Sequence, residues 1–159
     1  MTGPLDGYDL KILGELQSDG RLTNIELSER IALSASQCSR RRTRLEADGI
    51  IRGYQANLDR EKLGLDLLVV ISVTLSTHNR DNAQRFAKLI NDLPEVLVAY
   101  ALTGEMDYHL TVATRGLGDL SKFVNDVLLP HESVQHVKTS IVLDTLKNFS
   151  GLPLGEAAG

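Results

Sequence analysis

The 159-residue chain contains a single cysteine, so it cannot form an internal disulfide. Its longest apolar run, residues 67–73, is too short to cross a membrane, and its β-branched residues favour a buried strand. Residues 1–4 lack the basic and then apolar pattern of an export signal. From these absences we expect a cytoplasmic protein without a membrane span.

Motifs typical of metal sites and enzymes are also scarce. The four histidines, at positions 78, 109, 131 and 136, have no metal-ligand spacing, and no cluster of cysteines or carboxylates accompanies them. The chain has no glycine-rich phosphate loop and no nucleophile motif. We therefore expect no metal, no cofactor and no catalytic residue.

Negative charge dominates the chain but is unevenly distributed. The net charge is −4, yet residues 34–55 hold five arginines and two acidic residues, which gives +3. Residues 63–159 hold seven basic and eleven acidic residues, which gives −4. A basic patch near one end and an acidic remainder indicate two different tasks on one chain.

The basic stretch, residues 34–49, predicts one short helix with a signal at each end. Ser34 is a favourable N-cap, and Gln37 stands three residues later, where its side chain can complete a capping box. Gly49 can adopt the left-handed conformation that ends a helix. We expect the helix to span residues 35–48.

This helix has one thin apolar face, formed by Cys38 and Leu45. The opposite face is polar and basic, and it carries Gln37, Arg40 and Arg44 with Ser36 and Thr43 beside them. In a DNA major groove, arginine can hold guanine and glutamine can hold adenine by two hydrogen bonds each. A solvated charged face is the alternative interpretation of this stretch taken alone.

The preceding residues favour the DNA-binding interpretation. Thr23 and Glu26 form a second capping box, Leu27 and Ile31 follow it at helical spacing, and residues 32–33 leave room only for a tight turn. Two short capped helices with the basic one second make a helix-turn-helix. We expect base contacts from Gln37 and Arg40 and phosphate contacts from Arg41 and Arg52, so that the predicted DNA-binding residues are Ser36, Gln37, Arg40, Arg41, Arg44 and Arg52.

The chain in order predicts two domains. Residues 1–50 form the helix-turn-helix domain, and residues 51–64 form a wing, either a short hairpin or an extended arm, followed by a hinge. Residues 65–148 follow the order strand, helix, strand, strand, helix, strand, which is a ferredoxin-like module. Residues 149–159 are expected to form a tail. The elements expected in the second domain are strands at 67–75, 96–102, 108–114 and 134–143, helices at 79–93 and 117–129, and a turn at 103–107.

At this point the chain resembles the Lrp/AsnC family, the feast/famine regulators of bacteria and archaea, over roughly residues 5–148. The matching residues are Leu5, Asp6, Asp9, Ile12 and Leu13; Gly20 and Arg21; Leu27 to Arg30; Arg40 and Arg41; Leu45 and Glu46; Gly49 to Ile51; Gly53 and Tyr54; and Thr103 to Tyr108. The resemblance implies an α+β protein with an N-terminal winged helix-turn-helix and a C-terminal ferredoxin-like ligand domain. It also implies dimers formed through the second domain, further assembly into octamers, and small effectors, mostly amino acids, bound between subunits.

The chain departs from the family pattern within the basic helix. Many members carry a proline in the segment 34–37 and an aliphatic residue at position 42. This chain has no proline there, and position 42 is Arg42. The stem of Arg42 can lie over the core and keep its charge outside.

The turn at 103–107 is the best candidate for contact with an effector. An amino acid needs donors for its carboxylate, which the backbone around Gly104 can supply, and an acceptor for its ammonium group, which Asp107 can supply. The predicted effector-binding residues are Tyr100, Leu102, Gly104, Met106, Asp107, Thr139 and Ser140. The alternative is an ordinary β-turn capped by an acidic residue.

We therefore expect a DNA-binding transcriptional regulator that responds to an amino acid and acts as a homo-oligomer on double-stranded DNA. The first alternative is an enzyme like the sirohaem decarboxylases, relatives of this family with the same architecture. Such an enzyme needs basic residues and histidines around a large pocket, and the sequence shows no clear set. The second alternative is an assembly protein that binds DNA without an effector.

Overall fold

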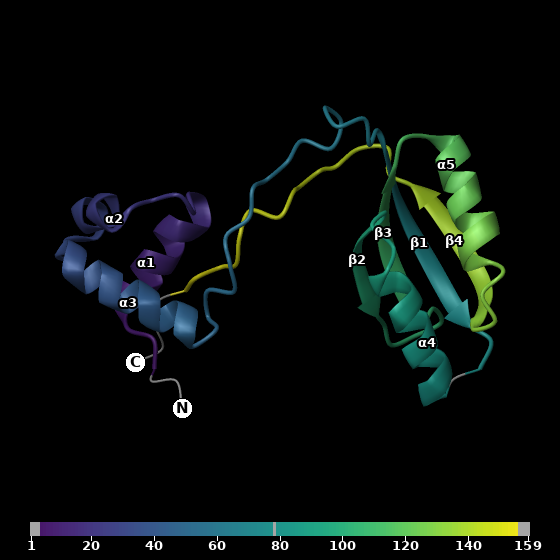
Figure 1. Cartoon of the computed structure of the whole chain (residues 1–159), viewed down its shortest axis with the longest axis horizontal. Helices are drawn as coiled ribbons and strands as arrows, with labels where there is room; N and C mark the ends of the chain where they lie inside the picture. The colour runs from purple at the N-terminus through teal and green to yellow at the C-terminus, as the bar shows by residue number, and fades with distance from the viewer. Residues whose placement is uncertain (1–3, 78, 156–159) are drawn as a thin grey trace. The chain divides into compact units, whose positions relative to one another are not determined.

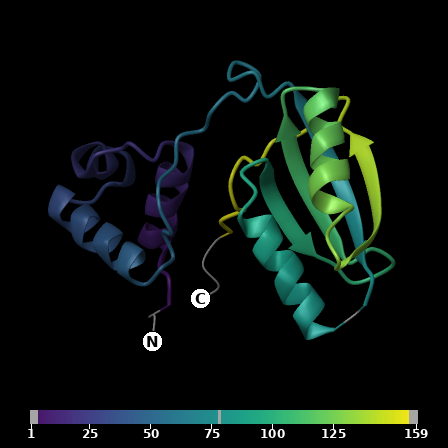
Figure 2. The ribbon, with the colours of Figure 1, turned by 45° about the vertical axis from the view of Figure 1, so that its right-hand side comes forward.

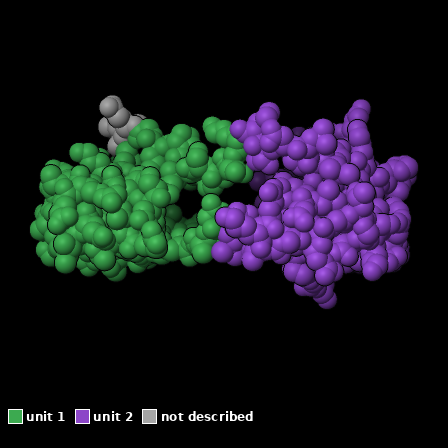
Figure 3. Space-filling model, turned by 90° about the horizontal axis from the view of Figure 1, so that it is seen from above, with its two compact units in different colours: residues 1–57, 147–159 green, residues 58–146 purple. Residues whose placement is uncertain are grey.

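The computed structural model describes residues 4–77 and 79–155. The chain divides into two compact units, coloured separately in Figure 3. Unit 1 takes in residues 1–57 and 147–159, and unit 2 takes in residues 58–146. The segment expected to form a tail therefore belongs to unit 1, the same unit as the helix-turn-helix.

Unit 1 contains three helices, α1 (Gly7–Ser18), α2 (Asn24–Ile31) and α3 (Ala35–Ala47), shown in Figure 1. Each begins at a complete capping box, with Asp6, Thr23 and Ser34 as the N-cap residues. The second and third boxes were expected from the sequence, and the first was not. The helices enclose one apolar core, formed by Ile12, Leu16, Leu22, Leu27, Ile31, Cys38 and Leu45.

The segment after α3 is an extended arm. The amides of Ile50 and Ile51 both donate to the carbonyl of Leu45, at 2.9 and 3.0 Å. Both side chains pack partly against the core of unit 1. Residues 52–59 then have no helical or strand hydrogen bonding. Of the two forms expected for the wing, the arm is therefore the one present.

The tail is bound to the first helix. The side-chain amide of Gln17 donates to the carbonyl of Leu152 at 2.9 Å, and the amide of Leu152 donates back to the Gln17 carbonyl oxygen at 2.7 Å. Gly151 lies directly against this pair at φ +110°. A Cβ at that position would come within 2.3 Å of the Gln17 side chain, so the contact requires glycine.

Unit 2 has the ferredoxin-like order that the sequence predicted. Its elements are β1 (Leu67–Leu75), α4 (Arg80–Asn91), β2 (Val96–Ala101), β3 (Tyr108–Thr114), α5 (Leu117–Lys122) and β4 (Val134–Ile141). The strands form one antiparallel sheet in the order β2-β3-β1-β4. Figure 2 shows α4 and α5 on the same face of this sheet.

The last helix of unit 2 differs from the single helix expected over residues 117–129. After α5 the chain widens into a π-helical segment, η1 (Phe123–Leu128). The amide of Leu129 donates to the carbonyl of Val124, five residues earlier. Because this wider turn brings residues five apart towards one face, Phe123 and Leu128 are both buried in the core.

Alternate side chains of the sheet separate a core face from an open face. Residues that point towards the helices are fully buried, and they include Val69, Ile71, Val73, Leu110 and Val112. The helices leave the other face uncovered (Figure 2). On that open face Val98, Thr111, Val70 and Ser140 form one cross-strand row, and Tyr100, His109, Ser72 and Lys138 form the next.

Candidate functional site

The outer face of α3 carries two of the predicted DNA contacts in positions open to solvent. Ser36 and Arg40 are both exposed. The Ser36 hydroxyl lies 3.1 Å from that of Ser34, so it shares in the cap of the helix. Within the described part of the chain, the Arg40 side chain has neither a hydrogen bond nor an ion pair, and the same holds for the exposed Arg52 side chain on the arm.

Gln37 is also exposed, but its side chain is engaged at the helix cap. Its carbonyl oxygen accepts from the amide of Ser34 at 3.0 Å and from the Ser34 hydroxyl at 3.0 Å. A two-bond contact with adenine needs that oxygen together with the amide nitrogen. Gln37 must therefore give up its part in the cap to make such a contact, and base reading by Gln37 stays a prediction.

The remaining two predicted DNA contacts, Arg41 and Arg44, are bonded to carboxylates in the first turn of α1 and at its N-cap. Arg41 Nη1 donates to Asp9 Oδ1 and to Asp6 Oδ2, each at 2.7 Å. Arg44 Nη2 donates to the other oxygen of Asp9. The Asp9 side chain is completely buried. Both arginines thus hold α3 to α1, and their contact with DNA stays a prediction.

These bonds favour the charged forms of Asp6 and Arg41. The backbone amide of Asp9 and the Arg41 guanidinium hold the pKa of the Asp6 carboxyl below its usual value. Hydrogen bonds to Asp6 and then to Asp9 raise the pKa of Arg41. The sequence analysis named Asp9 among the residues that match the family, but it missed the role of Asp9 as a shared acceptor. The available signal was that Asp9 is an acidic residue among the apolar positions of α1, and that α1 packs on the basic helix α3.

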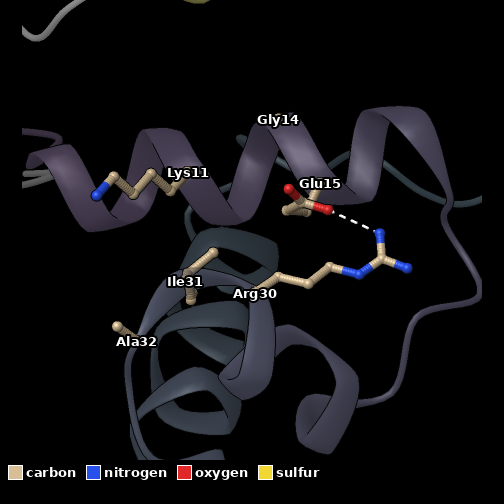
Figure 4. Close-up of a pocket in the computed structure, with 6 residues that line it drawn as sticks. All are labelled: Lys11, Gly14, Glu15, Arg30, Ile31 and Ala32. Atoms are coloured by element: carbon tan, nitrogen blue, oxygen red, sulfur yellow. Dashed lines mark hydrogen bonds and ion pairs between the residues drawn. The ribbon is translucent and has the colours of Figure 1, made fainter.

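Unit 1 also has a shallow hollow of about 450 Å³ between α1 and α2 (Figure 4). Its lining residues are Lys11, Gly14, Glu15, Arg30, Ile31 and Ala32. Arg30 Nη1 donates to Glu15 Oε2 at 2.8 Å across one side of it. Because no residue of α3 lines it, this hollow is separate from the predicted DNA-binding face.

In unit 2 the predicted effector loop is a tight connection between β2 and β3. The amide of Leu102 donates to the carbonyl of Asp107 at 2.8 Å, which closes the loop. Gly104 has φ +130° and no atom within 4 Å of where a Cβ would stand, so its backbone is open to solvent. One carboxylate oxygen of Asp107 accepts from the amide of Leu75 at 2.7 Å. The Met106 sulfur accepts from the Thr74 hydroxyl at 3.5 Å.

One chain does not bring the seven predicted effector residues into one cavity among its described residues. Asp107 lies against the end of β1, whereas Ser140 and Thr139 pair with Val70 and Ile71 further along that strand. Successive residues of a strand point to opposite faces, so the Thr139 and Ser140 hydroxyls also diverge from each other.

A second hollow lies between α4 and the edge strand β2, next to the loop. It has a volume of about 200 Å³ and a largely apolar lining, formed by Phe86, Ala87, Ile90, Asn91, Ala99, Tyr100, Ala101 and Tyr108. Of the predicted effector residues, only Tyr100 lines it. Three alanines leave the space open, a feature that the sequence analysis did not identify.

The described residues include no group of three or more His, Cys, Asp or Glu that could hold a metal ion. His78 lies outside the described residues. Within the described part of the chain, no helix is both long and apolar enough for a membrane span.

Comparison with known proteins assigns both units. Residues 5–52 match the family model for a winged helix-turn-helix DNA-binding domain, and residues 68–152 match that for the Lrp/AsnC ligand binding domain. Among characterised relatives, the leucine-responsive regulatory protein of Rhizobium meliloti is 40% identical over 144 residues, which cover 91% of this chain and 92% of that protein. The transcriptional regulator AzlB of Bacillus subtilis is 35% identical over 152 residues, covering 96% of this chain and 97% of that protein.

Solved structures agree with this assignment. A transcriptional regulator from Neisseria meningitidis, crystallised as a complex with L-Met, superposes with a TM-score of 0.91 at 46% identity, covering 94% of this chain and 97% of that chain. An AsnC family transcriptional regulator from Agrobacterium tumefaciens superposes with a TM-score of 0.89 at 29% identity and the same coverage.

The fold, the capped basic helix and the matched domains define a DNA-binding regulator with a separate ligand-binding domain. The chain belongs to the Lrp/AsnC family of transcriptional regulators. The expectation of this family, and of its winged helix-turn-helix and ferredoxin-like units, is confirmed.

Proposed function

We propose that this chain regulates transcription in the cytoplasm as a homo-oligomer and without catalysis. We also propose that an amino acid bound at a subunit contact changes the affinity of the protein for DNA. The observation that carries this proposal is the arrangement of α3. Cys38 and Leu45 bury its apolar face in the core, and Arg40 is exposed on the outer face. Arg40 is our candidate for base reading and Arg52 for phosphate contact, with Ser36, Gln37, Arg41 and Arg44 around them.

The dimer contact proposed here is the open face of unit 2. Val98 and Tyr100 are 40% and 60% exposed on that face, and Leu102 just beyond β2 is 41% exposed. A sheet face that its own helices do not cover is stabilised by packing on another layer, and two identical faces can cover each other about a two-fold axis. Association of such dimers into octamers is the further step that the family resemblance implies.

The effector is proposed to bind where the loop 103–107 meets another subunit. The separation of Asp107 from Thr139 and Ser140 within one chain supports this, because a second chain is needed to complete the set. A carboxylate offers about four acceptor positions, so Asp107 can hold the Leu75 amide and an ammonium group together. The relative from Neisseria meningitidis in complex with L-Met supports an amino acid as the ligand.

The test of this proposal is a pair of variants titrated with amino acids by calorimetry. Asp107→Asn keeps an oxygen for the Leu75 amide but removes the negative charge, so it separates ligand binding from the folding of the loop. We expect it to lose effector binding while DNA binding without effector stays close to that of the parent. Asp126→Asn removes one charge from an exposed position of η1 and serves as the matched control.

Three outcomes would contradict parts of the proposal. Effector binding by Asp107→Asn as tight as that of the parent would place the site elsewhere. A parent protein that binds none of the twenty amino acids, yet binds DNA, would favour the assembly protein without an effector. A Tyr100→Asp variant that remains oligomeric by light scattering would exclude the open face as the dimer contact. Its control is Leu63→Asp, at an exposed position in the segment between α3 and β1.

A further inference from the structure

Three side chains at the end of unit 1 form a closed cluster, called the arm clamp here: Arg42 and Glu46 of α3 and Tyr54 of the arm. Arg42 Nε donates to the Tyr54 hydroxyl at 2.9 Å and to Glu46 Oε1 at 3.2 Å. The Tyr54 hydroxyl donates to the same Glu46 oxygen at 2.8 Å. The Arg42 guanidinium also lies over the Tyr54 ring, 4.7 Å from its centroid.

The arm clamp is anchored on both sides. Arg42 Nη1 donates to the carbonyl of Leu22, at 2.8 Å, in the turn that leads to α2. On the other side, Gly20 leaves room for the aromatic ring, since a Cβ there would lie 3.1 Å from Tyr54 Cδ1. Burial, and next the hydrogen bond to Glu46, raise the pKa of Tyr54, so its hydroxyl stays a donor over a wider pH range than in a free tyrosine. The cluster thus ties the arm to α3 and to the turn.

One exposed arginine, Arg52, lies between the arm clamp and an earlier anchor in the chain. Ile51 is fixed by the hydrogen bond from its amide to the carbonyl of Leu45, and Tyr54 is fixed by the arm clamp. Arg52 and Gly53 lie between these two anchors. Gly53 has φ +153°, so it would allow the arm to swing if the second anchor were absent.

We propose that the arm clamp is a positioning device that holds Arg52 beside α3 for contact with a DNA phosphate. The proposal rests on the DNA contact of Arg52 put forward above. A fixed backbone lowers the entropy that is lost when a long side chain is immobilised on a ligand, so a held arginine binds a phosphate more tightly than one on a free arm. Arg42, Glu46 and Tyr54 act through Arg52 and need not touch DNA themselves.

The experiment is a double-mutant cycle on DNA affinity, measured with the full chain over a range of salt concentrations. The first member is Arg52→Ala. The second is Tyr54→Ala, which removes the arm clamp without changing the charge of the protein, and Tyr54→Phe is its conservative form because the ring remains. Gln55→Ala, an exposed neighbour on the arm, is the matched control.

In the parent, Arg52→Ala is expected to weaken binding to all sequences alike and to reduce the slope of log affinity against log salt by about 1 per contact. In the Tyr54→Ala background the same substitution should have less than half of that effect on affinity. Tyr54→Phe should give an intermediate result, and Gln55→Ala should match the parent. Arg42→Lys, which keeps the charge but loses the planar fork, should behave like Tyr54→Ala.

The outcomes separate this inference from the proposed function. If Arg52→Ala weakens binding equally in the parent and in the Tyr54→Ala background, the phosphate contact stands and the positioning role is wrong. If Arg52→Ala leaves both affinity and salt slope unchanged in the parent, the proposed contact of Arg52 and the positioning role both fail. Circular dichroism of each variant checks that α3 is still folded, and the Arg52→Ala comparison is made within each background.

Discussion

Replacement of Asp9 by alanine should destabilise unit 1 through the loss of one buried acceptor. Asp9 is completely buried and binds both Arg41 and Arg44. Its second oxygen also accepts from the amide of Asp6 at 3.1 Å, which is half of the capping box of α1. A single substitution therefore removes two ion pairs and one helix cap contact at the junction of α1 with α3.

The size of the effect follows from how well the two arginines can be solvated afterwards. Removing one partner of a buried ion pair costs about 3–5 kcal/mol. Arg41 keeps Asp6 as a partner, and the Arg44 side chain is 48% exposed, so water can reach it. These partners lower the expected cost to the bottom of that range, about 3 kcal/mol.

The single cysteine provides the assay. Cys38 lies in the core of unit 1 with no exposed surface, and burial raises the pKa of its thiol, so a thiol reagent reacts only when the unit opens. Where closing is faster than labelling, the rate reports the opening equilibrium. A loss of about 3 kcal/mol predicts labelling about 140-fold faster, because every 1.4 kcal/mol is tenfold.

Two comparisons make this result decisive. Asp9→Asn keeps an oxygen for the Asp6 amide and should fall between the parent and Asp9→Ala. Asp126→Ala makes the same change of charge in unit 2 and should leave Cys38 labelling unchanged. Labelling of Asp9→Ala within about threefold of the parent, less than 1 kcal/mol, would refute the structural role assigned to this carboxylate.

Three further predictions follow from unit 1. Arg40→Ala should cost about 1–3 kcal/mol on specific DNA and relax the sequence preference, and unchanged affinity for both specific and scrambled DNA would contradict base reading. The pKa of the Asp6 carboxyl is lowered in the folded protein. Its contribution to stability is therefore present at a pH above the pKa of the unfolded state, 3.8, and is lost as the pH falls through the pKa of the folded state. Asp6→Asn keeps a capping oxygen but cannot titrate there, so acid titration by circular dichroism should show a weaker pH dependence than in the parent; identical acid curves would oppose this. Gly151→Ala should detach the tail from Gln17, seen as faster hydrogen exchange of the Leu152 amide, and unchanged protection would contradict it.

The sequence predicted the architecture because its signals are local. Capping boxes at Thr23 and Ser34 mark two helix starts within a few residues, and the alternation from Tyr108 to Thr114 gives a strand with those same ends. The π-helical turn was missed because the apolar spacing of residues 117–129 also fits an ordinary helix. Only packing against the sheet distinguishes the two, since it brings both Phe123 and Leu128 into the core.

Side-chain partners at the candidate site were harder to predict, because they join distant parts of the chain. Asp9 and Arg41 are 32 residues apart, and nothing near either one indicates the other. The arm clamp was missed for the same reason: Arg42 appeared as a departure from a family pattern, and its partner Tyr54 follows 12 residues later on an arm without regular structure. In the effector loop, spacing predicted the turn but not that Asp107 binds the amide of Leu75 in β1.

The distribution of these partners changes what the basic patch can do. Residues 34–55 include five arginines, but Arg41 binds Asp6 and Asp9, Arg44 also binds Asp9, and Arg42 binds Glu46. Of these five arginines, only Arg40 and Arg52 are exposed without an ion pair to a described residue. Counterion release counts cations that neutralise phosphates, and of these two arginines only Arg52 is a candidate phosphate contact. A slope of about −0.9 per contact therefore predicts roughly −0.9 from this segment of each subunit, rather than the roughly −4.5 that five phosphate contacts would give. Removing Arg40 and Arg52 together should therefore abolish nearly all of the segment's salt dependence; a double variant that keeps most of the parent slope would show that the paired arginines exchange their carboxylates for DNA.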